Sequence, residues 1–567
     1  MIRRMSPRFD IICLLILISS GSFAQKRFVS GLVYDSVTRE PIPYAGIGVE
    51  GGYQGTASNV NGVFEFIFDC EDTCSIKISC LGYFSKKVSA DMPYDTIWLK
   101  PASKILKEVV VLSKEVNAYK IVKKAIRSIK KNYITDPFVM QAFYREYCQR
   151  SGTYTRLIEA AFDLYQPKGY RKRLYRDTTF NGKLKLVQTR RLFNQHDNGF
   201  HPPIAVRSAL TADIVGSRGE MYALAMETTF TSPIMWSKQL LKDGYSFTLN
   251  KMSYLDGEEV FEIGFYKELY TRYDGIKAEH TGKLYISSKS FAILRYESNK
   301  GDENLNFITG VTRVDYKLFG KRYSLFRIEK SRRFGKDHVD HFEILNTRVT
   351  LGKSTDTYKN SITRADIAYS TYDPQFWDTY NVLTRNKLEQ KIVEDLQQNS
   401  ELKLNEHYFS EQELELKIYE EEQNNRKALD SLIRHNDALL CIAFYEYNGR
   451  FSLADQYQRA VDNIKRLKNA GVKFVFVSLD YNRHDWLTYI KKNDLEGEKH
   501  LRLGVDVKKE KYHLRRTIGM TQYQIYYKTR LIDGNVEPPY SKKFIEVINP
   551  YLEKISKRSE GAMSPGD

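Results

Sequence analysis

Residues 28–66 read FVSGLVYDSVTREPIPYAGIGVEGGYQGTASNVNGVFEF, and this stretch decides the fold of the first part of the chain. Apolar and polar residues alternate in short runs, which are separated by Gly, Pro, Asn and Asp. Short alternating runs with turn residues between them are typical of a small antiparallel β-sandwich. The dipeptide Asn61-Gly62 is one that tight hairpin turns favour. We therefore expect an all-β domain with a hairpin turn at Asn61-Gly62.

Extended to residues 26–112, the same region resembles the carboxypeptidase-regulatory-like domain, a prealbumin-type sandwich of exported proteins in diderm bacteria. The resemblance implies a folding or docking module that has no peptidase chemistry despite its name. The residues that carry it are Gly31, Asp35, Thr38, Pro41, Ile42, Ala45, Thr56, Asn61, Gly62, Phe64, Gly82 and Tyr83.

The N-terminus has the features of a secretory signal peptide. Arg3, Arg4 and Arg8 precede an apolar run at 11–18, and the small residue Ala24 follows. This order predicts export and removal of residues 1–24, and the run is too short to span a membrane comfortably. An uncleaved anchor is the alternative. We expect the mature protein in the periplasm or at the outer membrane, without a transmembrane helix after signal cleavage.

Length and composition point to several domains with ordinary cores. The chain has 567 residues, of which 42% are hydrophobic, so it is long enough for more than one domain and apolar enough to fold. Its formal net charge is +17. In an exported protein, this charge favours an anionic glycan or a lipid surface as partner over nucleic acid, with generic solubility as the alternative.

The cysteines indicate at most limited stabilisation by disulfides. Cys13 lies within the signal peptide, so an odd number of the six cysteines remains and at least one thiol is unpaired. Cys70 and Cys74 flank a short turn between two apolar runs, where either a disulfide or two free thiols could stand. Cys441 lies inside an apolar run and is expected to be a small core residue.

Residues 113–384 predict an α+β domain with a helix and an antiparallel sheet. In the segment 118–133, apolar residues recur at helical spacing and basic residues occupy the other face. Such a helix could lie on a membrane surface, but the strand pattern that follows closely favours docking onto its own domain. Alternating runs at 257–297 predict a meander. This meander resembles the curved half-barrel sheets of periplasmic lipoprotein carriers, which hold an acyl chain on a concave apolar face.

A segment at 170–191 interleaves aromatic residues with positive charge. After export, an acidic glycan or a lipid headgroup would be the matching ligand, and a solvated loop or edge strand is the simpler interpretation. The candidate residues for binding an anionic surface are Arg171, Lys172, Arg173, Arg176, Arg190 and Arg191.

The run Asp337-His338-Val339-Asp340-His341 contains residue types that bind metals. On a strand, alternation sends His338 and Asp340 to one face and Asp337 and His341 to the other. Four ligands cannot converge on one zinc ion from both faces without a bulge. We therefore predict no metal site here, and no other pattern indicates a cofactor.

The C-terminal region predicts an α/β domain at 431–557, after a helical linker at 385–430 and before a tail at 558–567. The apolar runs at 438–445 and 472–479 are each followed by a turn and a helix-like segment. This order resembles the exported thioredoxin-like domains of the thiol-disulfide interchange family. In that family, a Cys-x-x-Cys pair stands in the first turn and an Ile-Pro dipeptide lies beside it.

The chain departs from the family at both of these places. The first turn reads Gly449-Arg450-Phe451-Ser452, and Thr521 stands where the family has proline. Thiol exchange requires a thiolate nucleophile and a resolving thiol. The resemblance therefore implies a thioredoxin-like domain that has lost its redox activity.

Together these patterns predict an exported, non-enzymatic binding or assembly protein of the cell envelope. Its partner would be an unknown envelope protein, an anionic glycan or a lipid surface. Two alternatives stay open. One is an enzyme related to thiol-disulfide oxidoreductases that uses Cys148 or Cys441, and the other is a periplasmic carrier of lipids or envelope precursors. The reactivity of the native thiols separates the first alternative from a binding protein.

Overall fold

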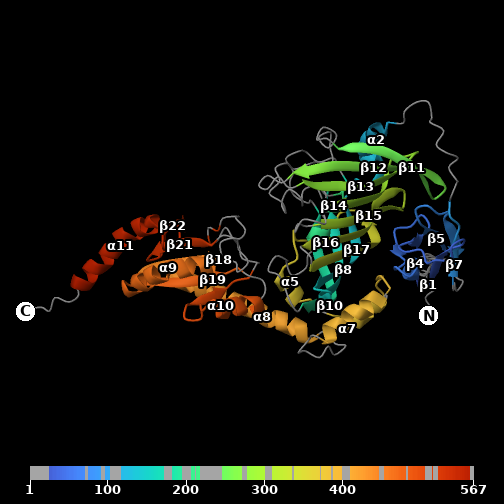
Figure 1. Ribbon diagram of the computed structural model, residues 1–567. Coiled ribbons are helices and arrows are strands. Elements are labelled where there is room, and N and C mark those ends of the chain that lie inside the picture. Colours follow the sequence, from blue (N-terminus) through green and yellow to red (C-terminus); the bar gives the residue numbers. More distant parts are fainter. Residues whose placement is uncertain are drawn as a thin grey trace, which may run out of the picture.

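The computed structural model describes the chain in three successive bodies, a β-sandwich, a ten-stranded sheet and an α/β domain (Figure 1). Within the described residues, no helix is both long enough and apolar enough to cross a membrane. The described residues are 25–70, 74–90, 96–102, 117–170, 182–194, 206–210, 212–216, 245–270, 277–300, 309–334, 337–370, 372–384, 387–398, 409–445, 453–479, 483–504, 512, 514 and 521–561.

The first body is a sandwich of two sheets, with the strand orders β4-β1-β7 and β3-β2-β5-β6. Inward-facing apolar side chains from both sheets, such as Phe64 and Ile78, form its core. A disulfide joins Cys70 to Cys74 between β4 and β5. The strands are β1 (Gln25–Asp35), β2 (Gly46–Val49), β3 (Gly55–Ala57), β4 (Val63–Cys70), β5 (Ser75–Ser79), β6 (Lys86–Ser89) and β7 (Thr96–Leu99).

The prediction of a β-hairpin at Asn61-Gly62 is wrong. Gly62 has the positive φ of +76° that favours glycine, but β3 and β4 on either side lie in different sheets. The side chain of Asn59 accepts hydrogen bonds from the amides of Asn61 and Val63, at 2.9 and 3.0 Å. These local bonds stabilise a turn that carries the chain from one sheet to the other.

The second body is a continuous antiparallel sheet with the order β10-β9-β8-β17-β16-β15-β14-β13-β12-β11. It is strongly twisted, so that β8 and β12 run in very different directions in Figure 1. The strands are β8 (Phe138–Arg150), β9 (Thr153–Gln166), β10 (Lys183–Asn194), β11 (Ser246–Leu255), β12 (Glu258–Tyr270), β13 (Lys277–Ser287), β14 (Ile293–Lys300), β15 (Thr309–Phe319), β16 (Arg322–Phe334) and β17 (His338–Leu351).

Helix α2 (Ala118–Asn132) docks on this sheet, as its pattern predicted. Asn117 caps the helix, because its side chain accepts a hydrogen bond from the Lys120 amide. Ile121, Val122 and Ala125 are buried in the core that the sheet forms. Three short helices lie along the same body, namely α3 (Val206–Leu210), α5 (Arg364–Ala368) and α6 (Pro374–Asp378).

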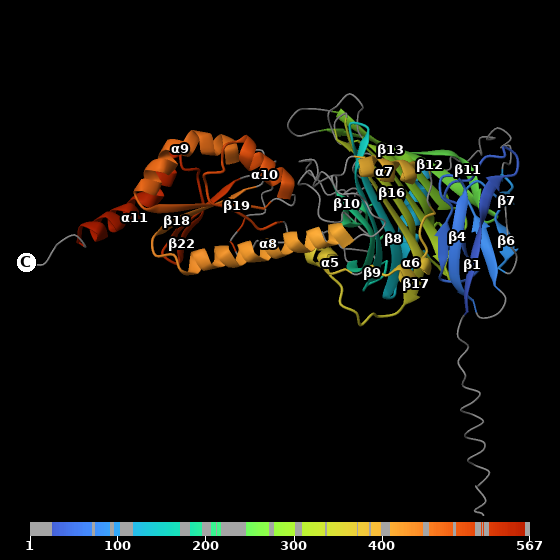
Figure 2. The same cartoon turned by 90° about the horizontal axis from the view of Figure 1, so that it is seen from below.

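The expected helical linker at 385–430 is divided between the bodies on either side of it. Helix α7 (Lys387–Gln398) packs Ile392 and Leu396 against Leu157 of β9. Helix α8 (Phe409–Arg434) runs from the β10 edge of the sheet into the α/β domain, where Leu429 is buried (Figure 2).

The third body has a five-stranded sheet with the order β20-β19-β18-β21-β22. Strands β18, β19 and β20 are parallel, whereas β21 and β22 are antiparallel to their neighbours. Its elements are β18 (Leu439–Tyr445), α9 (Leu453–Asn469), β19 (Val472–Ser478), α10 (Arg483–Lys492), β20 (His500–Arg502), β21 (Gln522–Tyr527), β22 (Arg530–Val536) and α11 (Lys542–Gly561).

Candidate functional site

One face of the ten-stranded sheet carries charged side chains of alternating sign on neighbouring strands. Arg145 Nη2 lies 2.9 Å from Glu159 Oε1. Arg145 Nη1 and Arg327 Nη2 each lie 3.5 Å from a carboxylate oxygen of Glu343. Arg327 Nη2 also lies 2.8 Å from Glu329 Oε2. We call this set the ion-pair ladder; its members are Glu159, Arg145, Glu343, Arg327, Glu329, Asp315 and Arg295.

The centre of the ion-pair ladder is buried beneath the sandwich and the segment that follows the sheet. Arg145 and Arg327 are 3% and 0% exposed. The ring of Tyr44, in the sandwich, lies 3.3 Å from the Arg327 guanidinium carbon. Arg145 donates a hydrogen bond to the Leu383 carbonyl. Buried charges require such pairing, so the docked sandwich and the ladder depend on each other.

Backbone hydrogen bonds fix the position of the sandwich on the sheet. The Gly320 amide donates to the Gly52 carbonyl at 2.9 Å, and the Gly82 amide donates to the Tyr254 carbonyl at 2.7 Å. The Asn381 side chain accepts from the Ile67 amide at 2.7 Å and donates to the Ile67 carbonyl at 2.6 Å. These directional contacts make the two bodies a single unit in the structure.

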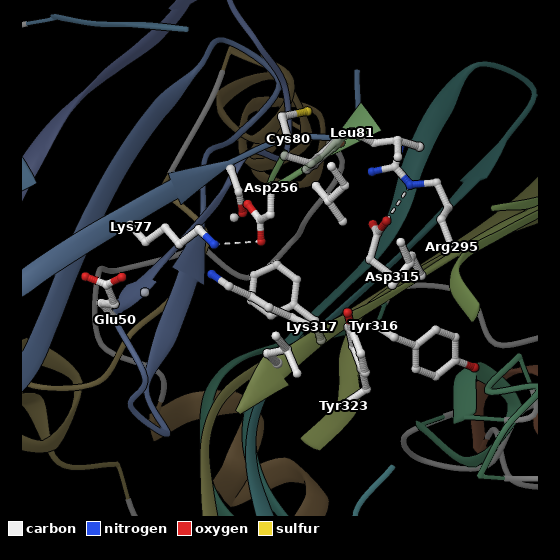
Figure 3. A pocket seen from close by; sticks show the side chains of 18 of the residues that line it. Glu50, Lys77, Cys80, Leu81, Asp256, Arg295, Asp315, Tyr316, Lys317 and Tyr323 are labelled. Atoms are coloured by element: carbon white, nitrogen blue, oxygen red, sulfur yellow. Dashed lines mark hydrogen bonds and ion pairs between the residues drawn. The ribbon is translucent and has the colours of Figure 1, made fainter. Parts of the chain in front are cut away.

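A pocket of about 320 Å³ lies where the sandwich meets the sheet (Figure 3). Lys77 of β5 and Asp256, in the turn between β11 and β12, form an ion pair of 2.8 Å inside it. The Arg295–Asp315 end of the ladder forms another wall. Most of the remaining lining is apolar, including Leu81, Val49, Leu255, Leu294, Leu318 and Phe326.

Lys317 of β15 enters this pocket over the backbone of β2. A Cβ atom at Gly46 or Gly48 would lie 3.2 or 2.9 Å from the Lys317 Nζ, so these two glycines leave the space that the lysine occupies. The Nζ is buried and has no hydrogen-bond partner among the described residues. Burial lowers the pKa of this amine to about 8, with nearby Lys77 also lowering it and Asp256 opposing the change.

The Glu343 carboxyl makes the unit sensitive to acid. Burial alone would raise its pKa, but the nearby His341 side chain, whose Nε2 lies 3.8 Å away, together with Arg145 and Arg327, lowers it to about 2 from an ordinary 4.5. A carboxyl with a lowered folded-state pKa stabilises the fold above its unfolded pKa, and this stabilisation is lost as the pH falls through the folded-state value.

We therefore expect the free energy of unfolding to decrease as the pH falls from about 5 to about 2. A shift of this size corresponds to about 3 kcal/mol. Glu343→Gln should show a pH dependence weaker by roughly that amount, measured as urea unfolding at several pH values. Parallel curves for the two proteins would exclude this role for Glu343.

The possible metal ligands of the run 337–341 lie largely on the faces of the strand that side-chain alternation predicts. His338 Nε2 lies 2.6 Å from Asp340 Oδ1 on one face, whereas the His341 ring stacks on Tyr147 on the other. Cys148, opposite Asp340 on β8, joins the first pair, and one possible ligand atom from each of the three lies within 4.8 Å of the others. Sequence reasoning missed Cys148 because strand pairing alone brings it there. Arg332 Nη2 lies 3.2 Å from Asp340 Oδ2, and such a cation disfavours a metal ion at this carboxylate.

Of the predicted anionic-surface residues, the structure describes only the side chain of Arg190. Arg190 lies in β10, with its Nη1 3.9 Å from Glu159 and its guanidinium 5.7 Å from the centre of the Trp377 ring. Arg191 also lies in β10, but its side chain is outside the described part. The other four, Arg171, Lys172, Arg173 and Arg176, lie outside the described residues.

Of the predicted redox-turn residues, the structure describes Thr521. Gly449, Arg450, Phe451 and Ser452 lie outside the described residues, between β18 and α9. Thr521 is half-buried directly before β21. Its neighbour β21 pairs with β18.

The free thiols of the described residues lie in surroundings that disfavour the thiolate. Cys148 and Cys441 are buried, and Cys80 is half-buried in the pocket wall. Burial raises the pKa of the Cys441 thiol. Burial, together with Asp340 and Glu146, raises the pKa of Cys148, and desolvation also raises that of Cys80.

Residues 29–111 match the family described as the CarboxypepD_reg-like domain, which supports the interpretation of the first body. No curated protein matches the chain. Among solved structures, the chain is similar to a DUF1329 family protein from Desulfovibrio piger ATCC 29098. The identity is 10%, the match covers 42% of this chain and 95% of that protein, and the TM-score is 0.21. A similarity this low carries no argument about fold or function.

Proposed function

We propose that the chain is an exported, non-enzymatic binding or assembly protein of the cell envelope. The docked sandwich and ten-stranded sheet would form its binding body. The observation that carries this proposal is the pocket between them, which has an apolar lining and a few charged groups from both bodies. Small-molecule sites typically have this composition and often lie between domains. Export rests on the signal-type pattern at residues 1–24.

We propose that the third body is a thioredoxin-like domain without redox activity, serving as a second interaction module. Its strand order, with β18 between parallel β19 and antiparallel β21, supports this assignment. The segment that follows β18 contains no cysteine. A thioredoxin-like fold without its two thiols can still offer a binding surface.

The surroundings of the free thiols argue against the thiol-enzyme alternative. The thiolate is the reactive form, and the raised pKa values of Cys148 and Cys441 keep both thiols protonated near neutral pH.

The carrier alternative requires space on the apolar face of the sheet. In the described part of that face, α2 and the packed rings of Tyr133, Tyr170 and Tyr316 occupy the centre.

Alkylation of the native protein tests the choice between a binding protein and a thiol enzyme. In iodoacetamide at pH 8, we expect Cys148 and Cys441 to react at least about 100-fold more slowly than free cysteine, because both thiols are buried and protonated. Both should react fully after denaturation in guanidinium chloride, with the sites assigned by peptide mass spectrometry. Rapid labelling of either thiol in the native protein would favour the enzyme.

A further inference from the structure

We propose that the pocket between the sandwich and the sheet binds a small monocarboxylate with a short apolar body, whose carboxylate lies between Lys317 and Lys77. The proposal rests on the proposed function, in which the docked sandwich and sheet form the binding body. It adds the chemical class of the ligand and the residues that select it.

Among the described side chains that line the pocket, one cationic group, that of Lys317, has no hydrogen-bond partner. Lys77 is paired with Asp256 at 2.8 Å. Figure 3 shows Lys77 and Lys317 reaching the same region of the pocket from the sandwich and from the sheet.

The other charged groups of the lining already have partners. Glu50 is paired with Lys87, and Arg295 with Asp315. The Lys317 ammonium lies 5.1 Å from the centre of the Phe326 ring. A buried ammonium group that has only such a ring contact, and no hydrogen bond, is still unfavourable, so an anionic group of the ligand would stabilise Lys317. Two lysines and one aspartate favour a ligand with a single negative charge.

The shape and lining of the pocket indicate the rest of the ligand. Gly46 and Gly48 provide the room in which Lys317 crosses β2. Beyond the lysines, leucines of both bodies and Phe326 form the apolar walls, and the Arg295–Asp315 ion pair forms a polar wall. A cavity of about 320 Å³ is near the lower end of the range for small-molecule sites. A compact apolar chain therefore fits this space better than a large lipid.

The test uses octanoate as the probe and the full mature chain. Isothermal calorimetry should show saturable binding of one octanoate per chain at pH 7, and 1-octanol should bind more weakly because it lacks the charge. Lys317→Met should weaken octanoate binding about tenfold to a hundredfold, the usual effect of losing a hydrogen bond to a charged group. Lys321→Met is the matched control, because Lys321 is exposed in the turn after β15 and does not line the pocket.

Two further measurements separate binding from a structural role of Lys317. Octanoate affinity should be constant between pH 6 and 7 and fall above about pH 8, where Lys317 loses its proton. Without octanoate, Lys317→Met should unfold at the same or a higher temperature than the native protein, because the variant no longer buries this charge.

Three outcomes would overturn the proposal. They are the absence of saturable octanoate binding at millimolar concentrations, equal binding of octanoate and 1-octanol, and undiminished binding to Lys317→Met. Thiols that stay protected from alkylation in the same preparation would show that the proposed non-enzymatic function survives such a failure.

Discussion

Replacing Arg327 with methionine is expected to lower the free energy of unfolding of the sandwich–sheet unit by about 3–5 kcal/mol, the usual cost of breaking a buried ion pair. Arg327 is 0% exposed and holds Glu343 and Glu329 at 3.5 and 2.8 Å. Methionine would fill much of the space, but the two carboxylates would lose their shared cation. The variant would also lose the contact of the guanidinium with the Tyr44 ring. Differential scanning calorimetry of the full chain measures the effect.

Arg313→Met is the matched control for this experiment. Arg313 lies on the same sheet and pairs with Glu297 and Glu329, but its side chain is 39% exposed. Ion pairs exposed to solvent contribute about 0–1 kcal/mol, so this variant should unfold almost as the native protein does. Equal losses of stability in the two variants would mean that burial does not increase the contribution of the ion-pair ladder to the free energy of unfolding.

Replacing Glu422 with alanine is expected to destabilise the α/β domain by about 3–5 kcal/mol for the same physical reason. Glu422 of α8 is 1% exposed, and Arg502 of β20 is 0% exposed. Arg502 Nη1 lies 2.7 Å from Glu422 Oε1. The α8 helix is also tied to β20 by the Asn425 side chain, which donates to the Arg502 carbonyl at 3.0 Å. Glu422→Ala removes the carboxylate that pairs with the buried Arg502 guanidinium, where α8 packs against β20.

Glu420→Ala provides the comparison, since Glu420 is exposed on the same helix. It removes the same charge and should change the unfolding free energy by no more than about 1 kcal/mol, as surface substitutions usually do. Urea unfolding followed by tryptophan fluorescence can report on the α/β domain, because Trp486 is buried there. A Glu422→Ala variant as stable as Glu420→Ala would contradict this account of how α8 joins the domain.

The features that could be predicted from the sequence are those determined by local patterns. Alternation around Phe64 and the turn residues between the runs indicated a β-sandwich, and the family match at residues 29–111 supports that domain. Helical spacing in the segment 118–133 was enough to predict that Ile121 and Val122 face the core, and the structure confirms their burial. In both cases, the periodicity of the segment itself carries the information.

The candidate site could not be predicted because it is made of distant residues. Lys77, Asp256 and Lys317 lie in three separate segments, and only the docking of two bodies brings them together. Cys148 reaches Asp340 through the register of β8 and β17. The hairpin prediction failed for a related reason, since the dipeptide Asn61-Gly62 indicates a turn but not the sheet to which each flanking strand belongs.

Hydrogen exchange with increasing denaturant tests most directly whether the sandwich and the ten-stranded sheet form one binding body. The account predicts that peptides from β4 and from β16 lose protection together, at the same free energy of opening, because the buried ion-pair ladder and the backbone hydrogen bonds couple the two bodies. If β4 exchanges at a much lower free energy while β16 stays protected, the sandwich is an independent domain. The pocket between the two bodies would then not be a stable site.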